Sequence, residues 1–288
     1  MNQKTIGIFA ILLTALMWAI EPIVAKLSYY NSDFLHATSI RSIVVAAVAL
    51  IYIFFTNRGN LKVSKKQFSI LLVIALVATC IAELIFLYAI SKSAVVNVVV
   101  VAHMQPVFIV LLGYFFLKKD RLNWFDYAGM SFMIVAGIMV TTKNIQNLAA
   151  LKLLSSTDLL VLFSAFLWAI TSLLTKKYLQ DINAGVIAFY RYSIGSLILG
   201  AYLFFNSSFM IANKYQIILG IVIGVGIILY YESIKRLKVA QAGALELTSP
   251  FFASILGYIF FKETITIMQF LGILLMFVGV YFLSRKEA

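Results

Sequence analysis

The chain has 288 residues, of which 63% are hydrophobic and 12% are charged, and its mean hydropathy is +1.01. These values lie far outside the range of a soluble globular domain and indicate an integral membrane protein. The formal net charge of +12 would suit a nucleic-acid-binding protein, but the basic residues lie where they set membrane orientation, so no nucleic-acid partner is expected.

Apolar segments of about 20 residues follow one another along the chain, and each is long enough to cross a hydrocarbon core of about 30 Å as a helix. The first segment is expected to stay as an uncleaved helix, because it is long, it carries Glu21, and no small-residue cleavage site follows it. The sequence predicts an all-α integral membrane protein with ten transmembrane helices, at residues 5–28, 34–55, 68–90, 94–117, 122–141, 156–178, 184–205, 215–234, 240–261 and 265–284.

Lysine and arginine residues are unevenly divided between the two ends of these predicted helices. Most of the 23 lie on the side that holds the amino terminus, as in the loop after the second helix, with Arg58, Lys62, Lys65 and Lys66. Basic loops of membrane proteins face the cytoplasm. The sequence therefore predicts a multi-pass protein of the plasma membrane, embedded in the lipid bilayer, with both termini in the cytoplasm.

Two stretches of the first half of the chain recur in the second half. WAIEPIVAK at 18–26 matches WAITSLLTK at 168–176, and QPVFIVLLGYFFLKK at 105–119 matches SPFFASILGYIFFKE at 249–263. Such self-similarity is the mark of an internal repeat.

The repeat divides the chain into two five-helix halves, at 1–145 and 156–288, joined by a polar linker at 146–155. Because each half crosses the membrane an odd number of times, the second half enters from the opposite side. This inverted arrangement is common in secondary transporters.

The paired features resemble the EamA-type domains of the drug/metabolite transporter superfamily, and the resemblance covers nearly the whole chain. It implies ten helices, a central substrate cavity and the export or uptake of small metabolites. Family members usually have no acid three positions after the tryptophan, so Glu21 followed by Pro22 departs from the pattern. The resemblance rests on a tryptophan inside the first helix of each half and a lysine near the end of that helix, on an arginine in the second helix and on a proline in the fourth. These residues are Trp18, Lys26, Trp168, Lys176, Arg41, Arg191, Pro106 and Pro250.

All three prolines, Pro22, Pro106 and Pro250, lie inside predicted helices. A proline frees the carbonyl four residues earlier, and in hydrocarbon that carbonyl must be covered by protein or by a water-filled cavity. Helix breaks at corresponding positions of two halves indicate a transport site. Pro106 and Pro250 are therefore expected to flank one; the alternative is that the prolines only curve packed helices.

Ionisable side chains inside the predicted helices are expected to face the protein interior and to pair. At about 1.5 Å of rise per residue, Glu21, Arg41 and Glu83 share one level near the outer boundary, so Arg41 is expected to pair with Glu83 or with Glu21. Arg191 and Glu246 lie nearer the cytoplasm and are expected to form a second pair. The two pairs are predicted to close the ends of the pathway alternately, unless the arginines only tie helices together.

Glu21, Glu83 and His103 are the candidates for proton coupling. If Glu83 neutralises Arg41, Glu21 is the surplus carboxylate; if Glu21 does so, Glu83 takes that place. A surplus carboxylate can bind a proton or the amino group of a substrate. His103 is a candidate proton relay, although a lone histidine in a helix also occurs as an ordinary hydrogen-bonded core residue.

Four aromatic residues stand out by position, because tryptophan and tyrosine usually concentrate at the membrane interfaces. They are Trp18, Trp168, Tyr88 and Tyr230. The two tryptophans lie in the middle of predicted helices, where they are expected either to line the cavity or to pack in the core.

The sequence has no HExxH motif, no GxSxG motif and no phosphate-binding loop. With two histidines and one cysteine, it predicts no metal site and no cofactor. The predicted function is secondary transport of a small polar metabolite, an amino acid or a related zwitterionic or cationic compound, by alternating access, with proton coupling as a hypothesis. The alternatives are a membrane sensor that binds without transport and an intramembrane acid-dependent enzyme.

Overall fold

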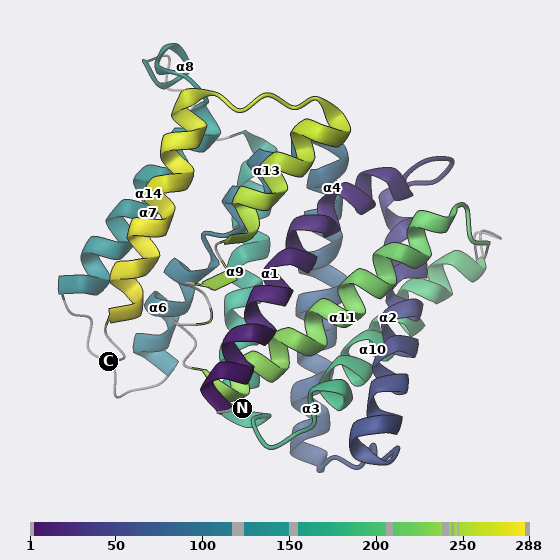
Figure 1. Cartoon of the computed structure of the whole chain (residues 1–288). Helices are drawn as coiled ribbons and strands as arrows, with labels where there is room; N and C mark the ends of the chain where they lie inside the picture. Colours follow the sequence, from purple (N-terminus) through teal and green to yellow (C-terminus); the bar gives the residue numbers. More distant parts are fainter. Residues whose placement is uncertain are drawn as a thin grey trace.

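The computed structural model describes residues 3–116, 124–149, 155–205, 210–237, 242, 245–246 and 248–285, and within these ranges the chain is helical, without strands. Figure 1 shows the helices as one bundle, in which α1 lies beside α11 and α7 beside α14. The helices are α1 (Gln3–Ser28), α2 (Phe34–Asn57), α3 (Lys65–Ile74), η1 (Ala75–Glu83), α4 (Leu84–Lys92), α5 (Val95–Ala102), α6 (Gln105–Phe116), α7 (Trp124–Thr142), α8 (Ile145–Ala149), α9 (Ser156–Tyr178), α10 (Ala184–Phe205), α11 (Lys214–Arg236), α13 (Thr248–Phe261) and α14 (Ile267–Arg285).

In the described part of the chain, seven helices are long and apolar enough to cross a membrane: α1, α2, the continuous helix from Lys65 to Lys92, the segment Val95–Gly113, α9, α10 and α11. Shorter apolar stretches lie in α7, α13 and α14. Each of these helices overlaps a range that the sequence predicts to be transmembrane, and several extend a few residues beyond it. The chain is thus a multi-pass membrane protein, and the crossing of the membrane by the three shorter helices stays a prediction.

Polar motifs start several of the helices near the predicted positions. Ser64 with Gln67 forms a capping box at α3, and Ser155 with Asp158 forms another at α9. In each box a hydroxyl and a side-chain oxygen satisfy backbone N–H groups that a helix leaves unpaired at its start. The predicted linker also contains the short helix α8, which the sequence does not predict.

The third predicted helix is continuous from α3 through η1 to α4, but its middle section is π-helical from Ala75 to Glu83. A π-helical section has a wider turn, so it changes the direction of the side chains around it, and such sections are frequent at functional sites. Thr79 and Glu83, both buried, belong to this section.

Proline acts differently in the three helices that contain it. α1 continues through Pro22, so the predicted break there is wrong: losing one backbone hydrogen bond does not interrupt a helix of 26 residues. The predicted helix at 94–117 is divided, because α5 ends at Ala102 and α6 begins at Gln105. Pro106 and Pro250 both lie in the first turn of a helix, where the missing N–H has no intrahelical partner to lose.

The two halves of the chain pack on each other in a reciprocal pattern. α2 contacts α10, α5 contacts α13 and α7 contacts α14. α1 packs against α11 and α13, and α9, at the corresponding place in the second half, packs against η1 and α4 and against α5 and α6. The start of α1 and the end of α14 lie at the same end of the molecule (Figure 1). The centre of the bundle is therefore built from helices of both halves.

Candidate functional site

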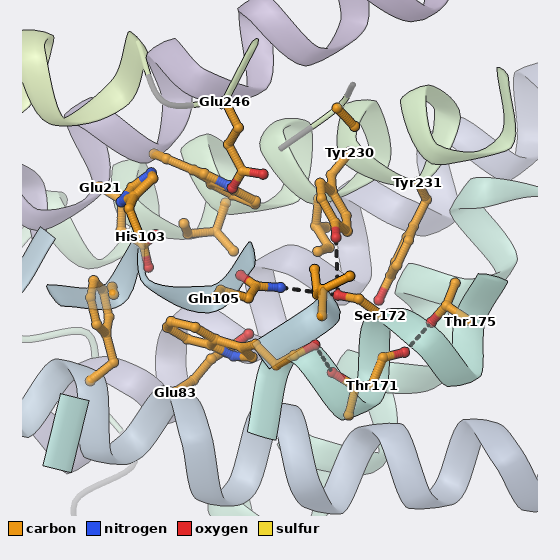
Figure 2. Close-up of a pocket in the computed structure, with 18 of the residues that line it drawn as sticks. Glu21, Glu83, His103, Gln105, Thr171, Ser172, Thr175, Tyr230, Tyr231 and Glu246 are labelled. Carbon is orange, nitrogen blue, oxygen red and sulfur yellow. Dashed lines mark hydrogen bonds between the residues drawn. The ribbon is translucent and has the colours of Figure 1, made fainter. Parts of the chain in front are cut away.

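A cavity of about 110 Å3 lies at the centre of the bundle. It is called the central cavity below, and Figure 2 shows most of the side chains around it. Its wall comes from both halves, from α1, η1, α4, α5, α6, α9, α10 and α11 and from the stretch that precedes α13. The lining residues are Trp18, Glu21, Glu83, Phe86, Val99, Ala102, His103, Gln105, Pro106, Ile109, Trp168, Thr171, Ser172, Thr175, Arg191, Tyr192, Ile223, Ile227, Tyr230, Tyr231, Ala242 and Glu246.

Glu83 is the most densely bonded group of the cavity wall. One carboxylate oxygen accepts a hydrogen bond from Arg41, and the other accepts from Arg191 and, at 2.6 Å, from the Tyr192 hydroxyl. All four side chains are buried. Buried charges persist in proteins when they are paired and hydrogen-bonded, so Glu83 is the common counter-ion of two arginines that come from different halves of the chain.

Arg41 is fully buried and contacts two carboxylates. Its second partner is Glu21, whose carboxylate lies 2.9 Å from the arginine Nη1. The sequence left the choice between Glu21 and Glu83 open, and the structure places Arg41 against both. Neither of these two carboxylates is therefore the surplus one.

The predicted pair between Arg191 and Glu246 is wrong. Arg191 donates to Glu83, to the Thr79 hydroxyl at 3.0 Å and to the Tyr231 hydroxyl at 3.0 Å. The depth argument located only the backbone of each residue. Because the arginine side chain is long, Arg191 reaches from its own level to Glu83, which the sequence places nearer the other side of the membrane.

Glu246 has a different partner, the indole of Trp18, which donates a hydrogen bond of 2.6 Å from Nε1 to the carboxylate. No lysine or arginine of the described part of the chain pairs with Glu246. The surplus carboxylate of the cavity is therefore Glu246, whereas the sequence offered Glu21 or Glu83 for that position.

His103 lies at the interruption between α5 and α6 and lines the cavity. Its Nδ1 is 2.7 Å from the Val99 carbonyl oxygen, which can only accept, so Nδ1 carries the proton. Nε2 is buried and has no hydrogen-bond partner among the described residues. Two residues further on, Gln105 donates to the Ser172 hydroxyl at 3.1 Å.

Aromatic side chains form much of the remaining wall. The rings of Trp18 and Tyr230 lie 6.3 Å apart, and the rings of Trp168 and Phe86 lie 5.2 Å apart with an edge-to-face geometry. Tyr88, the fourth aromatic residue singled out from the sequence, does not line the cavity. It packs on Phe34 at 5.3 Å, away from the other predicted site residues.

Among the prolines, Pro106 lines the central cavity, whereas Pro22 and Pro250 do not. The sequence prediction missed a stripe of hydroxyl groups on α9. Thr171, Ser172 and Thr175 follow Trp168 at helical spacing, which puts all four on one face of the helix. These small polar residues recur at helical spacing in an otherwise apolar helix, and this pattern could have identified them from the sequence.

An ion pair lies at the end of the bundle opposite the amino terminus. Lys26, in the last turn of α1, is 2.8 Å from the Glu263 carboxylate, which also accepts hydrogen bonds from the Val95 backbone N–H at the start of α5. Glu263 thus connects three elements, the ends of α1 and α13 and the start of α5.

The part of the chain that the structure describes contains no group of three histidine, cysteine, aspartate or glutamate side chains suited to a metal ion. The site is thus a cavity between two helical halves of a multi-pass membrane protein, with a largely apolar wall that carries a cluster of hydrogen-bonded polar side chains. Comparison with known proteins agrees: the EamA-like transporter family matches residues 5–142 and 155–285, and the chain belongs to this family.

Relatives of the chain include proteins named as uncharacterized transporters. One from Methanothermobacter thermautotrophicus is 26% identical, over 79% of this chain and 67% of that protein, and one from Synechocystis is 27% identical, over 76% and 66%. The chain thus spans about two thirds of the length of these two relatives. A third, from Archaeoglobus fulgidus, is 22% identical over 100% and 99%.

A solved crystal structure is similar to the whole chain in fold. It superposes with a TM-score of 0.71 at 16% sequence identity and covers 99% of both chains. At this identity the likeness concerns the fold alone.

Proposed function

We propose that the protein is a secondary transporter of a small polar metabolite, an amino acid or a related zwitterionic or cationic compound, working by alternating access. The observation that carries the proposal is the position of Glu83, which binds Arg41 and Arg191, corresponding residues of the two halves, beside a cavity that both halves line. A site held between two repeats is where a relative motion of the repeats changes its access.

Two inverted five-helix repeats, at 1–145 and 156–288 with a linker at 146–155, are the architecture proposed for this motion. The reciprocal helix contacts support it, as does the match of the family to two separate stretches of the chain. The plasma membrane is the proposed location, with both termini in the cytoplasm. The basic loop after α2 and the position of the chain ends at one end of the bundle support this orientation.

The gates proposed from the sequence change with the observed pairs. Arg41 and Arg191 form a single central cluster with Glu83 instead of two separate closures. The pair between Lys26 and Glu263 takes the place of the outer gate, because it ties together α1, α13 and α5 at one end of the bundle. Opening toward that end would separate this pair.

Proton coupling remains part of the proposal. Carboxylates and an imidazole beside a polar cavity are the groups that carry protons in membrane transporters. Glu21, Glu83 and His103 all line the cavity, and so does Glu246, which has no described cation as a partner.

The test is counterflow in liposomes that contain the purified protein, with a panel of labelled amino acids and other small metabolites at two pH values. We expect saturable counterflow of at least one compound, with a rate that depends on pH. Binding across the panel without counterflow would contradict transport and favour the sensor.

A further inference from the structure

The central cavity has one more carboxylate than it has guanidinium groups around it. Glu21, Glu83 and Glu246 line it, while Arg191 lines it and Arg41 lies behind Glu21 and Glu83. Both arginines are engaged by carboxylates, so the described wall offers no unpaired cation to an anionic ligand.

Glu246 is the carboxylate left without a cation. Its described hydrogen-bond partner is the neutral indole of Trp18, at 2.6 Å from Nε1. One N–H donor occupies one acceptor position, whereas a carboxylate has about four. A partly buried carboxylate that keeps its charge is stabilised by a positive partner, and a ligand bound in the cavity can supply it.

His103 adds a second hydrogen-bond acceptor to the same cavity. Since Nδ1 donates to the Val99 carbonyl, Nε2 of the neutral ring carries a lone pair, and it is buried without a partner among the described residues. Figure 2 shows His103, Glu21 and Glu246 on one side of the pocket, and Ser172, Tyr230 and Tyr231 on the other. A ligand with several N–H donors matches the first side.

The aromatic rings of the wall favour the same chemistry. Trp18, Trp168 and Tyr230 line the cavity, and the face of an aromatic ring attracts a cation, tryptophan most strongly. The cavity volume of about 110 Å3 is somewhat below the roughly 150 Å3 of a protein cavity that takes up benzene. The ligand is therefore small.

We propose that the central cavity binds a small protonated amine, whose ammonium group lies between Glu246 and His103 and whose apolar part packs against Trp18, Trp168 and Tyr230. The inference rests on the proposed transport function and narrows its substrate class to cations with N–H donors. Zwitterions need a second, positive subsite for their carboxylate, and the two arginines of the cluster are already paired.

The first test is binding to the purified protein in detergent, with three compounds that are smaller than benzene, similar in shape and different in charge: propylamine, 1-propanol and propionate. A ligand that binds the folded state raises the midpoint of thermal unfolding in a concentration-dependent way, and circular dichroism of the helices measures that midpoint. We expect propylamine to raise the midpoint, and 1-propanol and propionate to leave it unchanged.

Glu246→Gln tests the assigned carboxylate, because the amide oxygen can still accept from Trp18 while the negative charge is lost. We expect the variant to bind propylamine about ten- to a hundredfold more weakly, the range for losing a hydrogen bond to a charged group. Glu232→Gln is the matched control. Glu232 lies outside the cavity lining and pairs with Arg236, so its replacement should leave the affinity for propylamine unchanged.

The inference is overturned if 1-propanol or propionate stabilises the protein as much as propylamine does, if none of the three binds, or if Glu246→Gln keeps the wild-type affinity. Should Glu246→Gln fail to fold, the comparison of the three compounds on the wild-type protein decides by itself.

Counterflow separates this inference from the proposed function. Binding of propylamine without counterflow of any compound supports the amine site and contradicts transport. Counterflow of other metabolites supports transport, and it contradicts the amine site if propylamine neither inhibits the counterflow nor raises the midpoint of unfolding.

Discussion

Glu83 is the residue at which the polar interior of the protein converges. It neutralises two buried arginines and accepts a third hydrogen bond from Tyr192. Removing one member of a buried ion cluster leaves the other charges uncompensated. This lowers stability much more than replacing the whole cluster by apolar residues does. Glu83 is therefore expected to stabilise the fold as well as to shape the cavity.

Replacement of Glu83 by glutamine tests this expectation. Glu83→Gln keeps the shape of the side chain but removes its charge. Arg41 then keeps one carboxylate partner, Glu21, and Arg191 loses the carboxylate that it contacts. We expect the free energy of unfolding to fall by about 3–5 kcal/mol, measured by thermal unfolding of the purified protein in detergent. Glu232→Gln, near the end of α11, is the control, and equal midpoints for the two variants would contradict the prediction.

The sequence predicted the members of this cluster better than their pairing. Glu21, Arg41 and Glu83 could be placed at one level because helical rise converts residue number into depth. The partner of Arg191 could not be found in this way, since it depends on how far a long side chain extends. The partner of Glu246 is an indole, and no charge pattern points to a neutral donor.

Helix α11 packs closely on α2 through two glycines. A Cβ atom built at Gly224 would lie 2.9 Å from the Cβ of Val48, and one built at Gly220 would overlap Val44. Small residues at this spacing allow two helix backbones to approach within a membrane. Gly220 and Gly224 are the first and fifth residues of the stretch GIVIGVG at 220–226.

A larger side chain at Gly224 should force α11 away from α2. For Gly224→Val we expect a loss of about 1–3 kcal/mol of stability, the usual cost of overpacking, seen as a lower midpoint of thermal unfolding. Val225→Leu adds bulk one position along the same helix, at a side chain that is 38% exposed. A variant at Gly224 as stable as this control would show that the contact is not tight.

The helix is interrupted between α5 and α6, next to the central cavity. His103 and Met104 lie at the interruption, and Pro106 occupies the first turn of the helix that follows. Pro106 has no N–H to donate to the carbonyl four residues earlier, that of Ala102, the last residue of α5, which restricts the helix at this point. The interruption therefore lies where the proline removes a backbone hydrogen bond.

Pro106→Ala removes this restriction. We expect α5 and α6 to merge into a longer helix, which moves His103, and counterflow in liposomes to fall while the protein stays folded. Pro22→Ala is the matched control, because α1 is continuous at that proline and Pro22 does not line the cavity. If both variants keep wild-type counterflow, the interruption has no role in transport.

At the scale of the whole molecule, sequence repeats predicted the order of the helices but not the contacts between the halves. The pair between Lys26 and Glu263 joins the two halves at the end of the bundle away from the chain termini. Opposite charges at partly buried positions attract, and exchanging them keeps the attraction. This pair can therefore be tested for a role in opening.

Charge reversal at either residue should favour the state that is open at this end. In a background with Cys80→Ser, which removes the only cysteine of the sequence, Gln105→Cys places a single thiol at the cavity wall. We expect Lys26→Glu and Glu263→Lys each to increase its labelling by a membrane-impermeant maleimide, and the double exchange to restore low labelling. Labelling that is unchanged in both single variants would contradict a gate at this position.

The sharing of Glu83 by two arginines also has a thermodynamic consequence. If the two halves were identical, exchanging their conformations would turn the molecule inside out at no net cost, and the empty carrier would populate both orientations equally. Glu83 belongs to the first half alone. Arg191, in the second half, donates hydrogen bonds to Glu83, Tyr231 and Thr79. The two orientations therefore differ in free energy. An unloaded carrier has a preferred resting side, and a ligand must bind the other orientation more tightly to reverse that preference.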